Sequence, residues 1–121
     1  MANPGVQDNI RYIPATITSG TSLSAAVALD GLNLIGIQMP AGWDAAAVTF
    51  QVAYDGATYN NMWLQTAEFS ATTAASVTNL WSHDLLGPIR SVKVRSGTAG
   101  VPVNQTADRI VTLICSKIFV G

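Results

Sequence analysis

The chain is poor in charged residues of either sign. Of its 121 residues, six are Lys or Arg and seven are Asp or Glu, so the formal net charge is −1. Such a small, balanced charge gives no electrostatic reason to expect nucleic acid or an anionic membrane as a partner. The cations are scattered except for the group Arg90, Lys93 and Arg95. We interpret this group as the solvent-facing side of one strand, with an anion site as the alternative.

Residues that commonly carry chemistry are equally scarce. The one cysteine, Cys115, lies in the apolar run IVTLICS, which indicates a buried thiol and excludes a disulfide within the chain. The one histidine, His83, precedes Asp84, and adjacent residues of a strand point apart, so the two form no catalytic dyad. There is no GxSxG motif and no glycine-rich phosphate loop, and the acidic residues are isolated. We therefore predict a protein that is not an enzyme and uses no cofactor or metal.

Long hydrophobic runs are also missing. No segment reaches the roughly 18 apolar residues of a membrane helix, and the start MANPGVQDN lacks the basic and apolar regions of a signal peptide. Even so, 49% of the residues are apolar and only 11% are charged, against about 25% charged in an ordinary soluble domain. This excess predicts burial against copies of the chain or another protein, with an unusually apolar monomer as the alternative.

What the sequence does contain is period-two alternation of apolar residues, which is typical of β-strands. Residues 23–29 alternate and are followed by Asp30-Gly31, a pair that favours a tight turn into residues 34–39. Residues 48–54 form the clearest strand, with Val48, Phe50, Val52 and Tyr54 on one face. No stretch shows the helical period, so the fold is predicted to be all-β.

Two later strands complete the pattern. In the first, Val92 and Val94 are expected to face inward, and Lys93 and Arg95 to face water. In the second, residues 110–115 are apolar on both faces, as in a central strand that is covered on both sides. A chain of this length with about seven or eight short strands indicates one domain, a two-layer β-sandwich of jelly-roll type.

The two ends differ from this body. We predict an extended N-terminal arm over residues 1–14, a sandwich domain over 15–117 and an apolar C-terminal tail over 118–121. Arms and tails of this kind grip neighbouring subunits, because a strand added to another chain satisfies its own backbone groups there. A frayed terminus is the alternative.

The stretch VTFQVAYDGATYNNMWL, residues 48–64, predicts a hairpin around Asp55-Gly56 and permits two registers. A two-residue turn places Tyr59 and Trp63 on the core face. One more residue in the loop reverses the parity, so that Met62 and Leu64 face inward while Tyr59 and Trp63 face outward.

Exposed aromatic rings also raise the possibility of a carbohydrate site. Such sites need tryptophan or tyrosine rings together with polar side chains that reach sugar hydroxyls. The candidates are Trp43, Tyr59, Asn60, Asn61, Trp63, Trp81, His83 and Asp84. For each of them, burial in the core or in a subunit contact is the alternative.

Two long segments, IGIQMPAGWDAAAVTFQVAYDG and VKVRSGTAGVPVNQTADRIVTL, resemble small virion-associated proteins of tailed bacteriophages and prophages. The likeness extends from Ala15 to about Ser116. A weaker likeness, limited to FQVAYDGATYNNMW and IRSVKVRSG, is to discoidin-like jelly-roll domains, which often bind sugars or surfaces through loops at one end.

The phage resemblance implies a structural protein of the virion. We expect a capsid decoration, or cement, protein that is made in the host cytoplasm, binds the outer capsid surface and stabilises contacts between major capsid proteins. A homo-oligomer, with a trimer favoured, fits this role because contacts repeated by symmetry add up to tight attachment. The alternative is a carbohydrate- or receptor-binding module of a head fibre or tail. The candidate interface residues are Ile10, Tyr12, Tyr59, Trp63, Trp81, Ile118, Phe119 and Val120.

Overall fold

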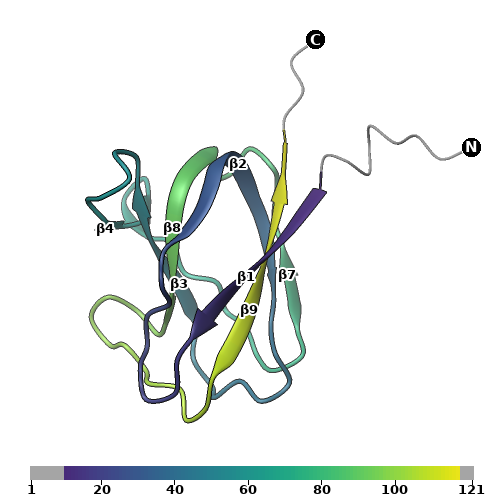
Figure 1. The fold of residues 1–121 in the computed structure, drawn as a ribbon, viewed down its shortest axis with the longest axis vertical. Helices are drawn as coiled ribbons and strands as arrows, with labels where there is room; N and C mark the ends of the chain where they lie inside the picture. Colours follow the sequence, from purple (N-terminus) through teal and green to yellow (C-terminus); the bar gives the residue numbers. More distant parts are fainter. Residues whose placement is uncertain (1–9, 118–121) are drawn as a thin grey trace, which may run out of the picture.

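The computed structural model describes residues 10–117, and every regular element among them is a β-strand (Figure 1). The strands are β1 (Ile10–Ile17), β2 (Val27–Gln38), β3 (Val48–Ala53), β4 (Asn60–Asn61), β5 (Trp63–Leu64), β6 (Ala67–Glu68), β7 (Thr78–Leu80), β8 (Pro88–Ser96) and β9 (Arg109–Ser116). The all-β class predicted from the alternation is confirmed.

Seven of these strands form one antiparallel sheet that folds over the long strand β2. The strand order is β1-β9-β2-β8-β3-β4, and β7 also pairs with β2. The first part of β2 pairs with β8, whereas its last part, Gly36–Gln38, lies between β9 and β7. The result is a sandwich in which one layer contains β1, β9, the end of β2 and β7, and the other contains the start of β2, β8, β3 and β4 (Figure 1). Its jelly-roll type stays a prediction.

The residues for which the sequence predicts a turn lie inside β2, in the part of the strand that pairs with β8. Asp30 and Gly31 have φ values of 52° and 90°, yet the strand continues through them, so the predicted tight turn is wrong. The pairing with β8 shifts between Ala28 and Leu32, which identifies the pair as a bulge. A bulge and a tight turn both need residues that tolerate positive φ, and a bulge bends a strand and increases its twist.

The N-terminal boundary also differs from the prediction. Residues 10–14, expected in an arm, belong to β1, which pairs with β9 from Ile10–Ser116 to Ile17–Arg109. Pro14 suggested an irregular segment, but β9 is the only described neighbour of β1 in the sheet, and proline is tolerated in an edge strand. Residues 1–9 and the predicted tail, 118–121, lie outside the described residues.

The core lies between the two layers and receives side chains from the long strands β1, β2, β3, β8 and β9. The fully buried apolar side chains are Ala15, Ile17, Leu29, Leu34, Ile37, Val48, Phe50, Ala53, Ile89, Val92, Val94, Val111, Leu113 and Cys115. The prediction of a buried thiol is confirmed, and desolvation raises the pKa of Cys115 to about 11. The alternation of β1 and β9 leaves their other residues on the outside of the sandwich.

Candidate protein-binding face

The outer side of the β1-β9-β2-β7 layer carries residues that stack in rows across the strands. The first row runs from Tyr12 of β1 through Ile114 of β9 and Gly36 of β2 to Leu80 of β7. In the second row the partners are Pro14, Thr112, Gln38 and Thr78. A third row contains only Thr16 of β1 and its partner Ile110 of β9.

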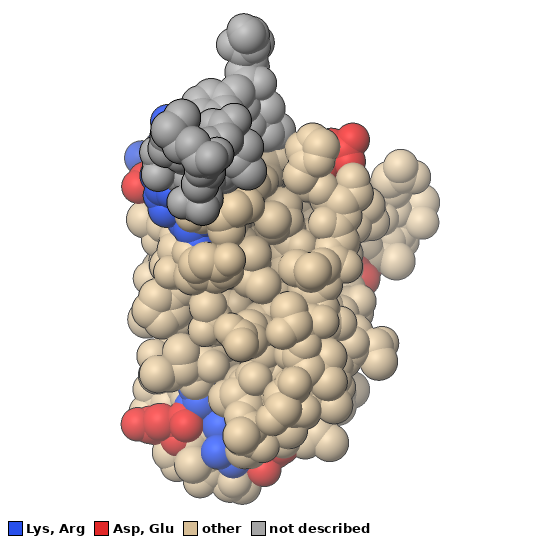
Figure 2. All heavy atoms as spheres, turned by 90° about the vertical axis from the view of Figure 1, so that its right-hand side faces the viewer, with Lys and Arg blue, Asp and Glu red and all other residues tan. Residues whose placement is uncertain are grey.

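None of these ten residues is charged, and we call the surface they form the charge-free face. Three of its large apolar side chains are open to solvent, since Tyr12 and Leu80 are both 68% exposed and Ile110 is 52% exposed. The exposure of Ile110 corrects the prediction that both sides of β9 are covered within the chain. Figure 2 shows this side of the molecule, where charged residues gather mainly at the two ends.

The chemistry of the charge-free face suits contact with another protein. Covering it desolvates no charged group, which would otherwise cost several kcal/mol per unpaired ion. Each apolar Å² removed from water contributes about 25 cal/mol. The row from Tyr12 to Leu80 is the apolar part of this face, and exposed apolar patches mark interaction sites in soluble proteins.

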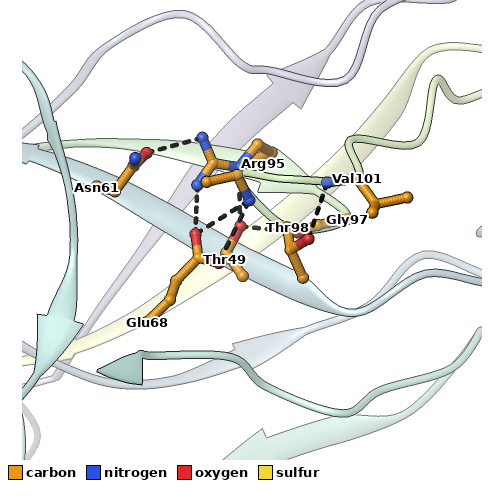
Figure 3. Close-up of polar contacts among 8 residues, drawn as sticks. Thr49, Asn61, Glu68, Arg95, Gly97, Thr98 and Val101 are labelled. Atoms are coloured by element: carbon orange, nitrogen blue, oxygen red, sulfur yellow. Dashed lines mark hydrogen bonds and ion pairs between the residues drawn. The ribbon is translucent and has the colours of Figure 1, made fainter. Parts of the chain in front are cut away.

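The outer side of the other layer is built differently, because it is polar and overlaid by other segments. Arg95 of β8, expected to face water, is only 6% exposed. Its Nη2 atom lies 2.6 Å from Oε2 of Glu68, and its Nε and Nη1 atoms donate to Thr49 and Asn61, each at 3.0 Å (Figure 3). The prediction that Arg95 faces water is wrong. Alternation along the strand shows on which side of the sheet a residue lies, but it does not show whether other segments cover that side.

Glu68 ties three segments together. Besides binding Arg95, its carboxylate accepts a hydrogen bond from the backbone N–H of Ala99, with Oε2 at 3.1 Å. This places the β5-β6 hairpin and the loop after β8 over the same buried guanidinium. On the same side, the Nζ atom of Lys93 lies 4.5 Å from the ring centroid of Tyr59, so Lys93 is not fully open to water either.

The hairpin after β3 adopts the second of its two possible registers. Val52 pairs with Asn60, and the N–H of Met62 donates to the carbonyl of Phe50 at 2.9 Å. Met62 is accordingly buried and Trp63 is 60% exposed. Leu64, expected inside, is exposed, because it lies in β5, which pairs with β6 rather than continuing along β3.

The predicted interface residues fall in different places. Tyr12 lies on the charge-free face, and Ile10 occupies the same side of β1, two residues earlier. Trp63 is exposed in β5, which forms a separate two-stranded sheet with β6. Tyr59 is half-buried and its hydroxyl lies 2.5 Å from Oγ of Ser91. Ile118, Phe119 and Val120 lie outside the described residues.

Two of the three indole rings considered for sugar binding are used inside the molecule. Trp43 is buried, and its Nε1 donates to the carbonyl of Ala46 at 3.0 Å. Trp81 is half-buried, packs edge-on against Phe69 at 5.2 Å and donates to the carbonyl of Leu34. Among the described tryptophans, only Trp63 presents its ring to solvent.

The remaining polar candidates are engaged in local contacts. The carboxylate of Asp84 accepts a hydrogen bond from Ser82 at 2.5 Å, and this bond lowers the pKa of Asp84. His83 is exposed, and its carbonyl accepts from the side chain of the buried Asn33. Asn60 is exposed beside β3. No cluster of three or more potential metal ligands occurs within residues 10–117.

Sequence reasoning missed most of the charge-free face. Leu80, Ile110 and Thr112 join Tyr12 only through the order of the strands, which local alternation does not specify. One feature of the sequence could have indicated this face: every second residue of 10–16 and of 110–116, counted from the first, is uncharged.

Comparison with known proteins leaves the function to be argued from this surface. Protein-family models, curated proteins and solved structures all give no match to the chain. Within the described part of the chain there is also no helix with the length and hydropathy needed to cross a bilayer.

Proposed function

We propose that the protein is a structural protein of a bacteriophage virion, a decoration or cement protein that attaches to the outer surface of the capsid. The charge-free face is the observation that carries this proposal. In a decoration protein, many copies pack against neighbouring subunits, and a face that costs little to desolvate is what such packing requires.

This role implies a binding partner and an assembly. The major capsid protein is the expected binding partner, and the protein itself is expected to act as a homo-oligomer. In an array, weak contacts repeated by symmetry give firm attachment. The charge-free face is the surface that each copy buries against a neighbouring subunit of the shell.

The test uses purified capsids of the phage that encodes the protein. The wild-type protein is expected to bind them in stoichiometric amounts and to raise the temperature at which they disrupt. Ile110→Lys introduces a charge on the charge-free face and is expected to abolish binding. Val101→Lys is the matched control, because Val101 is 69% exposed and lies in the loop after β8, away from that face. The proposal is contradicted if the capsids do not bind the wild-type protein, or if they bind the wild type and Ile110→Lys equally.

A carbohydrate-binding module is the second candidate, and the exposed ring of Trp63 is the observation that favours it. Against it, the oxygens of Asn61 and Glu68 already accept hydrogen bonds from Arg95. A glycan array separates the two functions. Binding that is lost in Trp63→Ala supports the carbohydrate module, whereas a blank array together with capsid binding removes it.

A further inference from the structure

β1 is a long edge strand of the main sheet (Figure 1). Its eight residues, Ile10–Ile17, pair with β9 in an unbroken register, and β9 is its only neighbour within residues 10–117. By contrast, β4 at the opposite edge has two residues, and β7, which pairs with β2, has three. An edge strand leaves a row of backbone N–H and C=O groups unpaired, and an added strand binds such a row.

The hydrogen bonds between β2 and β7 show in which direction the backbone groups of this layer point. The N–H of Trp81 donates to the carbonyl of Ile35 at 2.9 Å. The N–H of Met39 donates to the carbonyl of Val77, also at 2.9 Å. The odd-numbered residues of this part of β2 therefore bond to β7. Because backbone groups alternate in direction along a strand, the even-numbered residues between Ile35 and Met39 bond to β9.

The same alternation extends across β9 to β1. Over this stretch, even-numbered residues of β2 pair with even-numbered residues of β9, and β9 pairs odd with odd on β1. The odd-numbered residues of β1 therefore bond to β9. The N–H and C=O groups that point to the open edge belong to Ile10, Tyr12, Pro14 and Thr16. The position of Pro14 agrees with this, because proline has no N–H and is tolerated where the N–H would have no partner strand.

Pro14 determines which register of an added β1 strand fits this edge best. The edge offers N–H donors from Ile10, Tyr12 and Thr16 only. In one antiparallel pairing with β1 of a second copy, Ile10 faces the second copy's Thr16. Tyr12 then faces the second copy's Pro14, and all three donors of each copy meet a carbonyl, which makes six hydrogen bonds. A shift by two residues in either direction leaves four, because Thr16 or Ile10 then faces no residue of β1.

The side chains of β1 suit the same register. On the outer side, the ring of Tyr12, which is 68% exposed, lies opposite Pro14. On the inner side, Ile13 faces Ile13 of the second copy, and this side chain is half-buried against the core. Arg11 is the single charged residue of β1 and faces Ala15, so no like charges stand opposite each other.

We propose that β1 pairs with β1 of a second copy along this edge, so that the two β1-β9-β2-β7 layers become one continuous sheet. The contact is isologous and closes with two copies, which gives a dimer rather than the trimer expected from the phage resemblance. The inference does not rest on the proposed function, because the edge and the charge-free face are different surfaces. In the dimer the two charge-free faces lie on the same side of the sheet and stay open.

The experiment uses the full chain without capsids. Light scattering after size-exclusion chromatography is expected to give twice the mass of the chain for the wild type. Thr16→Pro removes an N–H that the fold itself does not use, so the variant should keep its circular dichroism spectrum and become a monomer. Pro14→Val adds one donor to each copy and should lower the dissociation constant of the dimer about tenfold.

A disulfide tests the register directly. Residue 13 lies on the two-fold axis in a non-hydrogen-bonded pair, where Cα atoms about 4.5 Å apart permit a disulfide. Ile13→Cys should therefore link two chains on oxidation, whereas Thr16→Cys should not, because Thr16 faces Ile10. The native Cys115 is buried. This measurement decides the matter if Thr16→Pro does not fold.

Leu80→Glu is the control, because it charges the charge-free face on β7, away from the edge, and should leave the dimer intact. A wild type that is monomeric up to its solubility limit overturns the inference, since Pro14 then protects the edge against pairing. A dimer that survives Thr16→Pro but not Leu80→Glu also overturns it, because the faces then make the contact. Absence of the Ile13→Cys cross-link excludes the proposed register and overturns it as well.

Discussion

The buried Arg95–Glu68 pair offers the sharpest test of how the polar layer is held together. Glu68→Gln keeps the size of the side chain but removes its charge, which leaves the guanidinium of Arg95 buried without a counter-ion. The relative exposures of the two side chains are 7% for Arg95 and 18% for Glu68, so solvent can screen little of the loss.

Removing one partner of a buried ion pair costs about 3–5 kcal/mol. We expect about 2–3 kcal/mol here, because the amide oxygen of Gln can still accept a hydrogen bond and Glu68 is partly exposed. At about 3–5 °C per kcal/mol for a domain of this size, the melting temperature should fall by about 10 °C. Urea unfolding and calorimetry measure the two quantities.

The double variant Arg95→Met/Glu68→Gln is the second arm of this test. Since it leaves no charge buried, it should be more stable than Glu68→Gln alone, and the two substitutions should be strongly non-additive. Asp30→Asn is the control, because Asp30 is exposed and Asn tolerates its positive φ of 52°. Its free energy of unfolding should stay within about 0.5 kcal/mol of that of the wild type. A Glu68→Gln effect as small as that of the control would refute the reasoning.

Three further outcomes are expected. Hydrogen bonds from the N–H groups of Thr58 and Ala57 lower the pKa of Asp55 from 3.8 to about 2, so its contribution to stability is present above pH 3.8 and is lost as the pH falls through about 2. An NMR titration midpoint near 3.8 would contradict this. Burial raises the pKa of Cys115 from 9.0 to about 11, so a thiol reagent at pH 8 should react only after unfolding, and stability should decline as the pH rises from 9 towards 11. Gly97→Ala should cost about 1–3 kcal/mol in urea unfolding, because Gly97 has a φ of 90° and a Cβ there would meet the backbone of Val101 to Val103; Gly100→Ala, with nothing within 4 Å, should be close to neutral.

Alternation along single strands made much of the fold predictable. The inward positions of Val48, Phe50, Val92 and Val94 follow from the alternation of apolar residues, which is a local property. Asp30-Gly31 shows the limit of local signals, because the same residues serve a turn and a bulge. Here the residues on both sides of the pair bind the same neighbour, β8, so the pair forms a bulge within one strand.

The candidate site was less predictable because it depends on strand order and on long-range cover. Arg95 is buried by Glu68, 27 residues earlier in the chain, and the sequence marks that partnership in no local pattern. Tyr12 and Leu80 share a row only because β9 and β2 lie between β1 and β7. For the hairpin around Asp55-Gly56, the sequence permits two registers that differ by one residue in the loop. The burial of Met62 shows which register the chain adopts.

The most direct test of the central claim, that this protein decorates a capsid through an uncharged sheet face, is a cryo-electron microscopy map of the virion. We predict density for the chain on the outer shell, in symmetry-related copies, with β1, β9 and β7 against a neighbouring subunit. A map in which the chain is absent from the shell, or in which that face points into solvent, would contradict the account.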